Sequence, residues 1–265
     1  LVVGPRIGRF DTDGTSHKMT PSSLPLAVLG CVILTFGWFG FNGGSTLALD
    51  HRVPGIVMNT LLSGCMGALV TTAIDWRRTG VPSAEPMING VLAGLVAVSA
   101  GAHVLSPASS LVIGAGSGIV VIGGQALLER ARVDDVVGAI PVHLGAGLWG
   151  TVATGALGEG AAFEGSRLAL LGVQSLGALI VALFAFGSSY GAFRVMRRFI
   201  GMRVSAEDEL RGLNVAEHGA STEIYELLQV MDAVGKSSGD NARADAQPHT
   251  DVGQIAKKYN EVLDE

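Results

Sequence analysis

Charged side chains are scarce in this sequence of 265 residues, because Asp, Glu, Lys and Arg together make up 15% of it. An average soluble domain carries about 25%. Apolar residues make up 48%, and the mean hydropathy is +0.45. Glycine, at 38 residues, is about twice as frequent as usual. This composition predicts an all-α membrane protein whose helices approach closely through small residues.

Cysteine is nearly absent as well. Cys31 and Cys65 both lie inside apolar runs, so they indicate neither a disulfide framework nor a metal site. The apolar segments also contain no nucleophile–base set and no cluster of metal ligands, which argues against a membrane enzyme. We therefore expect no catalytic activity, no cofactor and no bound metal.

The charges are unevenly distributed. Residues 203–265 are acidic and lack a long apolar run, whereas the basic residues of 1–202 gather at the ends of apolar segments. The net charge of −5 thus comes from the C-terminal tail and indicates no nucleic-acid partner. The first residue is Leu1, and no signal peptide precedes the first apolar segment, so we expect the chain to be part of a longer protein.

Six apolar segments follow an N-terminal polar loop. They run roughly over 24–49, 54–75, 87–105, 108–128, 136–157 and 167–193. Each is near the ~20 residues that a helix needs to cross a bilayer. Pro54 and Pro107 stand at segment starts, where a proline costs a helix little. Pro141 lies inside the fifth segment, and we expect it to bend that helix just before His143.

Basic residues alternate between the loops and so predict the orientation. The loops on the N-terminal side carry Arg6, Arg9, Lys18, Arg77, Arg78, Arg130, Arg132, Arg194, Arg197, Arg198 and Arg203. The opposite loops carry only Arg52 and Arg167, besides His51. The positive-inside rule then places both ends of the chain in the cytoplasm of a multi-pass cell-membrane protein.

The stretch 134–151, DDVVGAIPVHLGAGLWGT, contains the most informative polar residue. His143 lies in the middle of an apolar run and has no charged neighbour between Val136 and Leu157. An ionisable residue at membrane depth is costly, so it is a functional candidate by default. The alternative interpretation is a buried histidine that bonds a backbone carbonyl of a neighbouring helix.

The first apolar segment ends in GWFGFNGGS, residues 37–45. Phe41 and Ser45 are four residues apart, so they share one helix face, one turn apart. A phenyl ring with a hydroxyl just outside it would form an apolar gate below a polar landing site. The alternative is a set of interfacial aromatics, which are common at membrane ends.

Taken together, these stretches resemble the ammonium transporter family (Amt/Mep/Rh). The matching motifs are GWFGFNGGS at 37–45, MNT at 58–60, NGVLAGLVAVSAGAHVLSP at 89–107, VDDVVGAIPVHLGAGLWGT at 133–151 and GMRVSAEDELRGLNVAEHG at 201–219. The resemblance implies a helical bundle of eleven spans, with two inverted five-span repeats and a last helix. This chain resembles the second half, spans six to eleven, followed by the family's cytoplasmic C-terminal segment.

The resemblance assigns roles to five residues. Phe41 matches the gate phenylalanine of the sixth span, Ser45 the serine of the outer recruitment site, and His143 the second of two pore histidines. Asp134 and Asp135 match the acidic pair at the cytoplasmic start of the helix of His143. We expect both carboxylates to cap that helix and complement its dipole. The family usually has a proline after the pair, where this chain has Val136.

The implied function is transport of ammonium or ammonia across the cytoplasmic membrane: recruitment of ammonium, deprotonation, and passage through a hydrophobic, histidine-lined pore. The resemblance also implies a homotrimer in a lipid membrane and a PII-type regulatory protein on the cytoplasmic face. The other pore histidine belongs to the first half of the fold, so a functional pore requires that half.

The domain organisation predicted from these patterns has five parts. They are a cytoplasmic loop over 1–23, a six-helix membrane region over 24–200, a cytoplasmic region over 201–233, a flexible linker over 234–250 and a connector helix over 251–265. The last part resembles the connector helices of bacterial signalling proteins. The alternative function is therefore an ammonium sensor whose transporter-like region regulates a fused signalling domain.

The orientation can be tested by labelling single cysteines. We expect a cysteine at Gly160 to react from outside the cell and one at Ser237 to react from inside, because the basic loops alternate with poorly charged ones. If both positions were labelled from the same side, the six-span arrangement would be wrong.

Overall fold

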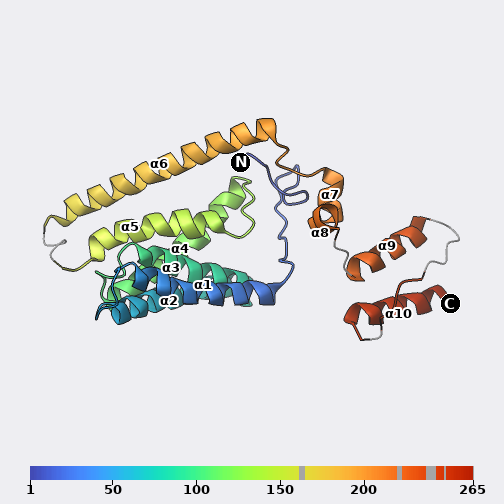
Figure 1. Ribbon diagram of the computed structural model, residues 1–265, viewed down its shortest axis with the longest axis horizontal. Coiled ribbons are helices and arrows are strands. Elements are labelled where there is room, and N and C mark those ends of the chain that lie inside the picture. The colour runs from blue at the N-terminus through green and yellow to red at the C-terminus, as the bar shows by residue number, and fades with distance from the viewer. Residues whose placement is uncertain (161–164, 220–222, 237–242, 248, 265) are drawn as a thin grey trace. The chain divides into compact units, whose positions relative to one another are not determined.

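The computed structural model describes residues 1–160, 165–219, 223–236, 243–247 and 249–264. Ser237, chosen above for labelling, lies outside these residues. The chain divides into two compact units, Leu1–Met202 and Arg203–Glu265. The described residues form helices and loops, with a single isolated backbone bridge between Phe10 and Ser16 and no strand (Figure 1). The predicted all-α fold is confirmed.

The first unit contains the apolar helices. They are α1 (Leu24–Gly44), α2 (Val53–Thr79), α3 (Ala84–Ser99), α4 (Pro107–Arg130), the π-helix η1 (Ile140–Gly145), α5 (Ala146–Leu157) and α6 (Arg167–Phe199). Three helices begin with a serine whose hydroxyl oxygen accepts a backbone N–H of the first turn; these caps are Ser23, Ser106 and Ser166. A proline also lies in the first turn of α1, α2 and α4.

Four helices, α1, α2, α4 and α6, are long and apolar enough to cross a membrane by length and composition. The other two predicted spans differ from expectation. The helix α3 has 16 residues and ends at Ser99, not near 105. The amide of Asn59 donates to the carbonyls of Ala102 (3.0 Å) and Leu105 (2.7 Å), and these bonds hold the chain beyond Ser99 in turns. The fifth span is divided into η1 and α5.

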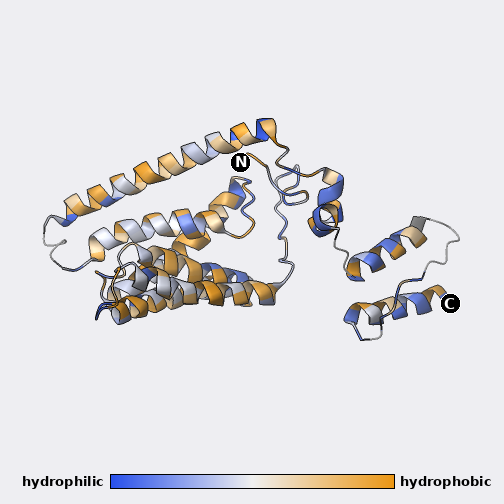
Figure 2. Cartoon of the chain, in the orientation of Figure 1, coloured by the Kyte–Doolittle hydropathy of each residue, from blue (hydrophilic) through white to orange (hydrophobic). Residues whose placement is uncertain are grey.

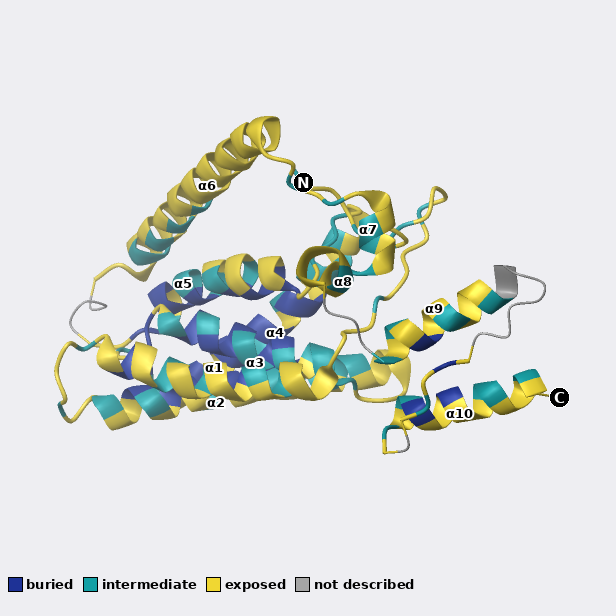
Figure 3. Ribbon diagram, turned by 45° about the vertical axis from the view of Figure 1, so that its right-hand side comes forward, coloured by how far each residue is buried: buried dark blue, intermediate teal, exposed yellow. Residues whose placement is uncertain are grey.

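Large apolar side chains cover the outside of the first unit. Apolar colours run along α1 and α6 (Figure 2), and both helices are largely exposed (Figure 3). Examples are Phe36, Leu168 and Phe184, each at least 75% exposed. Apolar surface of this extent is unfavourable in water but favourable against lipid. The first unit is therefore the body of a multi-pass membrane protein.

Backbone contacts at glycine hold the centre of this unit together. Helix α2 packs against α3 and α4, and the three backbones meet at Ser63. A Cβ on Gly94 of α3 or on Gly114 of α4 would collide with the carbonyl oxygen of Ser63. The Ser63 hydroxyl donates to the Gly94 carbonyl at 2.8 Å. These are the close contacts between small residues that stabilise helix pairs in lipid.

The described residues of the second unit form four short helices, α7 (Ala206–Arg211), α8 (Leu213–His218), α9 (Glu223–Lys236) and α10 (Asp251–Asp264). Ser205 caps α7, and Arg203 binds Glu209 through two nitrogens, both at 2.9 Å.

Part of the segment predicted as a flexible linker packs in this second unit. Residues 237–242 and 248 lie outside the described residues, but Ala244 is buried with Leu227 and Ala256. The side chain of Asn260 binds both backbone groups of Ala244, accepting from its N–H (2.9 Å) and donating to its carbonyl (2.8 Å). The described residues near Ala244 therefore differ from a free linker, because α10 satisfies their backbone polar groups.

Two glycines of α4 provide a matched test of the packing. We expect Gly114→Ala to lower the free energy of unfolding of the full-length protein by about 1–3 kcal/mol, because its Cβ would collide with the Ser63 carbonyl oxygen. Gly123→Ala should be neutral or stabilising by up to about 1 kcal/mol, since nothing lies within 4 Å of its Cβ position. Thermal unfolding in detergent measures both, and equal destabilisation would contradict the packing argument.

Candidate functional site

His143 lies on the π-helix η1, and the helix distortion expected at Pro141 takes this form. Pro141 has no backbone N–H to give to a helical bond. The N–H of Ala146 bonds the Pro141 carbonyl, five residues back, as in a π-turn. Single π-turns inside helices occur often at functional sites. They change the direction of the side chains that follow.

The neighbours of His143 are anchored, while its own side chain is not. Pro141 and Val142 are buried, and Pro141 packs where Gly124 of α4 has no side chain. The side chain of His143 is exposed and makes no hydrogen bond, ion pair or ring contact with the described residues. The alternative of a buried histidine bonded to a neighbouring carbonyl is thus not what this unit shows. Both ring nitrogens remain available to a ligand or to another part of the protein.

Asp135 fixes the start of this helix. Its carboxylate accepts the backbone N–H of Ala139 at 2.9 Å and that of Ile140 at 2.7 Å. Gly138 just before them has φ of 71°, a conformation that glycine adopts at no steric cost. The Asp135 carboxylate therefore satisfies two N–H groups at the N-terminal end of η1, as a helix cap does.

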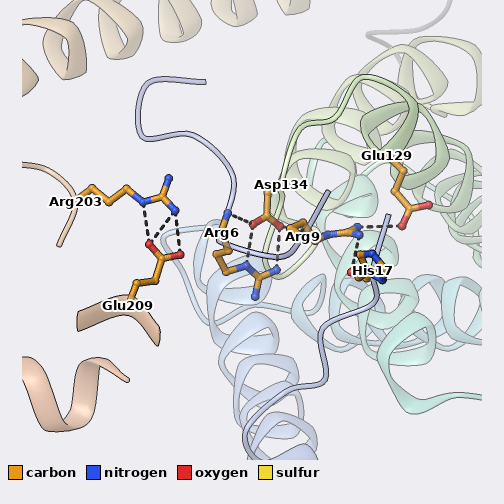
Figure 4. A network of polar contacts seen from close by, with 7 residues as sticks. All are labelled: Arg6, Arg9, His17, Glu129, Asp134, Arg203 and Glu209. Carbon is orange, nitrogen blue, oxygen red and sulfur yellow. Dashed lines mark hydrogen bonds and ion pairs between the residues drawn. The ribbon is translucent and has the colours of Figure 1, made fainter. Parts of the chain in front are cut away.

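Asp134 has a different role from the expected cap. Its side chain is only 3% exposed and forms an ion pair with the loop at the start of the chain (Figure 4). The Arg6 guanidinium donates to both carboxylate oxygens, from Nε at 2.8 Å and from Nη2 at 2.9 Å, and the Arg6 backbone N–H donates at 3.0 Å. These hydrogen bonds hold the pKa of the Asp134 carboxyl below its usual range. The expectation that both acids cap the helix is wrong for Asp134, because an arginine 128 residues away takes its oxygens.

The second group of site residues lies at the end of α1. Ser45 follows the helix directly, and its hydroxyl donates to the carbonyl of Phe41 at 2.6 Å. Because the hydroxyl proton is committed, the oxygen lone pairs are free to accept from a cation. The ring of Phe41 is 61% exposed and lies edge-on to the ring of Trp38, with centroids 6.0 Å apart.

Trp38 is a site residue that the sequence argument missed. Its indole N–H donates to the hydroxyl of Ser99 on α3 at 2.8 Å, and Ser99 donates in turn to the carbonyl of Leu95 at 2.7 Å. This chain of bonds fixes the aromatic pair against α3. The signal was present in GWFGFNGGS, but the partner of Trp38 is 61 residues away.

The structure thus places the candidate residues in two groups. Trp38, Phe41 and Ser45 lie together at the end of α1, and the side chain of His143 on η1 has no hydrogen bond or ring contact with them among the described residues. The same part of the chain contains no group of three or more His, Cys, Asp or Glu placed to hold a metal ion.

Fold and site together define a multi-pass α-helical membrane protein, with an aromatic–hydroxyl group at the end of α1 and an exposed imidazole on η1. The sequence profile of the Ammonium Transporter Family matches residues 1–223. The chain belongs to the ammonium transporter family.

Curated relatives agree over most of the chain. A putative ammonium transporter of Synechocystis is 45% identical over all of this chain and 49% of its own length. Ammonium transporter Amt2 of Archaeoglobus fulgidus is 42% identical over 83% of this chain and 50% of its own. The chain therefore spans about half the length of the curated relatives it matches.

Solved structures share the fold. A protein titled Sensor Amt Protein superposes with a TM-score of 0.78 at 34% identity, covering 82% of this chain and 54% of that one. Mep2 of Candida albicans superposes with a TM-score of 0.67 at 26% identity, covering 84% of this chain and 50% of that one. The predicted ammonium-transporter-like bundle is confirmed.

Proposed function

We propose that this chain forms one half of a pathway for ammonium or ammonia through the cytoplasmic membrane, with both of its ends in the cytoplasm. The observation that carries the proposal is the free imidazole of His143 on a fixed apolar helix in a chain of this family. Moving an intact, strongly hydrated cation through an apolar tube is costly. A pathway of this kind therefore needs a cation site outside the barrier and a neutral species within it.

The end of α1 has the chemistry of the cation site. The hydroxyl oxygen of Ser45 can accept a hydrogen bond from an N–H of ammonium in place of water, because the hydroxyl proton is already donated to the backbone carbonyl of Phe41. The faces of Trp38 and Phe41 offer negative quadrupole density to the same ion. After the ion gives a proton to water outside the barrier, neutral ammonia passes the Phe41 ring, which acts as the apolar gate.

His143 has the chemistry of the inner pathway. A neutral imidazole has one donor and one acceptor nitrogen, so it can bond ammonia in either sense. The resemblance to the family supplies a second histidine from the other half of the fold, which fixes the tautomer of the pair. The same resemblance supports a homotrimer and a PII-type protein as partners.

A second candidate function is ammonium sensing. The structural relative titled Sensor Amt Protein supports it, as does the amphipathic helix α10 at the end of the chain. Transport is better supported, because the Synechocystis putative transporter aligns with the whole of this chain, including α9 and α10. A catalytic signalling domain encoded beyond Glu265 would favour sensing.

Replacing His143 tests the inner pathway. In the full-length protein in liposomes, we expect His143→Ala to reduce ammonium conduction by about tenfold or more, or to change its selectivity, with oligomer assembly unchanged. A tenfold change corresponds to the loss of one hydrogen bond of ~1.4 kcal/mol. His103→Ala, an exposed histidine in the turns after α3, serves as control. Equal conduction in both variants would return His143 to a structural role.

Replacing Ser45 tests the cation site. We expect Ser45→Ala to raise the ammonium concentration for half-maximal uptake several-fold, because the hydroxyl oxygen is lost while the Phe41 gate remains. Ser188→Ala is a matched control, since the Ser188 hydroxyl donates to the carbonyl of Phe184, four residues back on α6, at 2.7 Å. Uptake that responds to neither change would exclude Ser45 from recruitment.

A further inference from the structure

We infer that Arg6, in the loop 1–23, is the positioning residue for the helix that carries His143 and acts on it through Asp134. The inference rests on the proposed function only in so far as His143 lines the pathway. It assigns a role in conduction to a segment that precedes every apolar helix in this chain.

The contact itself is built for fixed geometry. Arg6 binds Asp134 with a two-nitrogen fork and with its own backbone N–H, so both the side chain and the backbone of the loop are held (Figure 4). Arg9 adds a longer contact from Nε at 3.6 Å. A shielded carboxylate that loses such a partner is strongly destabilised, because its charge stays uncompensated. A planar guanidinium fork also fixes direction, which a lysine ammonium does not.

A continuous series of backbone contacts connects Asp134 to His143. Asp135, the next residue, holds the N–H groups of Ala139 and Ile140. The N–H of Val142 then bonds the Gly138 carbonyl at 3.1 Å, and Pro141 is buried against α4. A slip of one residue in this segment would turn the imidazole by roughly a quarter of a turn. The direction of His143 therefore depends on where Asp134 is anchored.

The ion pairs of the loop with Glu129 and Glu85 are more exposed than the pair of Arg6 with Asp134. Arg9 binds Glu129 at the end of α4 at 3.1 Å, and Lys18 binds Glu85 at the start of α3 at 3.4 Å. Glu129 is half exposed, and both partners of the Lys18–Glu85 pair are exposed. Exposed pairs contribute little, because water and salt screen them. Asp134, which pairs with Arg6 and at longer range with Arg9, is the shielded carboxylate among the loop's ion pairs in the described part of the chain. Lys18 provides a matched control.

Hydrogen exchange on the full-length protein tests the positioning without using transport. In Arg6→Gln we expect the amides of Ala139, Ile140 and Val142 to exchange about 10–100 times faster, the size of a lost charged hydrogen bond. Lys18→Gln should leave them within about twofold of the parent. Unchanged exchange in Arg6→Gln, or equal acceleration across α2, α3 and α4, would overturn the inference, since the latter indicates only a general loss of stability.

Two further variants keep the test decisive if Arg6→Gln does not fold. Arg6→Lys keeps the charge without the fork, and it should accelerate the same amides several-fold relative to Lys18→Gln. In the charge-swapped double variant, Arg6→Asp with Asp134→Arg, these amides should exchange their hydrogens more slowly than in Asp134→Arg alone. If the amides exchange at the parent rate in Arg6→Lys, or if the charge-swapped double variant exchanges as fast as Asp134→Arg, Arg6 does not position this helix.

Transport kinetics separate this inference from the proposed function. We expect Arg6→Gln to lower the maximal rate of ammonium uptake about tenfold while the half-saturating concentration stays unchanged, because Ser45 lies on a different element. A raised half-saturating concentration at an unchanged maximal rate would contradict positioning of His143. If the parent protein takes up no ammonium, the proposed function fails, while the exchange experiment still decides the role of Arg6.

Discussion

The close approach of three helix backbones at Ser63 is the constraint on which the rest of the first unit depends. Lipid offers no hydrophobic drive for helices to associate, so their packing and hydrogen bonds must hold them. Gly94 and Gly114 allow α3 and α4 to reach the Ser63 carbonyl, and the Ser63 hydroxyl returns a bond to α3. Because α4 is fixed in this way, the groove at Gly124 is fixed too, and Pro141 of η1 fits there.

Many polar groups inside this bundle are hydrogen-bonded, whereas Asn59 Oδ1, Asn89 Nδ2 and Thr154 Oγ1 are buried without a partner among the described residues. Asn42 donates to the Thr60 hydroxyl at 3.0 Å, and Asn59 bonds two carbonyls beyond α3. Trp149 of α5 donates its indole N–H to the carbonyl of Ile113 at 2.9 Å. An unmatched polar group would be costly in an apolar surrounding. The imidazole of His143 is exposed and has no hydrogen-bond or ion-pair partner among the described residues, so it is open to a ligand or to the other half of the fold.

The two candidate groups of residues are stabilised by different means. The aromatic pair at the end of α1 is held by a neutral chain of hydrogen bonds from Trp38 to Ser99 and Leu95. The helix of His143 is held at its start by charge, through Asp135 on backbone N–H groups and Asp134 on Arg6. Charged anchors lie at the cytoplasmic end in our proposed orientation, where water reduces the cost of assembling them.

The sequence by itself determined the class, the family and most helix positions, because these depend on local composition and on motifs such as GWFGFNGGS and DDVVGAIPVH. It also brought Phe41 and Ser45 onto one face, since helical spacing alone decides that. Only the tertiary structure decided that α3 ends at Ser99, that η1 is a π-helix and that Asp134 binds Arg6. The end of α3 and the Asp134–Arg6 pair depend on partners far away in the sequence, and a periodic pattern carries no information about which distant side chain will take a given carbonyl or carboxylate. The form of η1 depends on Pro141, which lacks an N–H, and on its contact with Gly124 of α4.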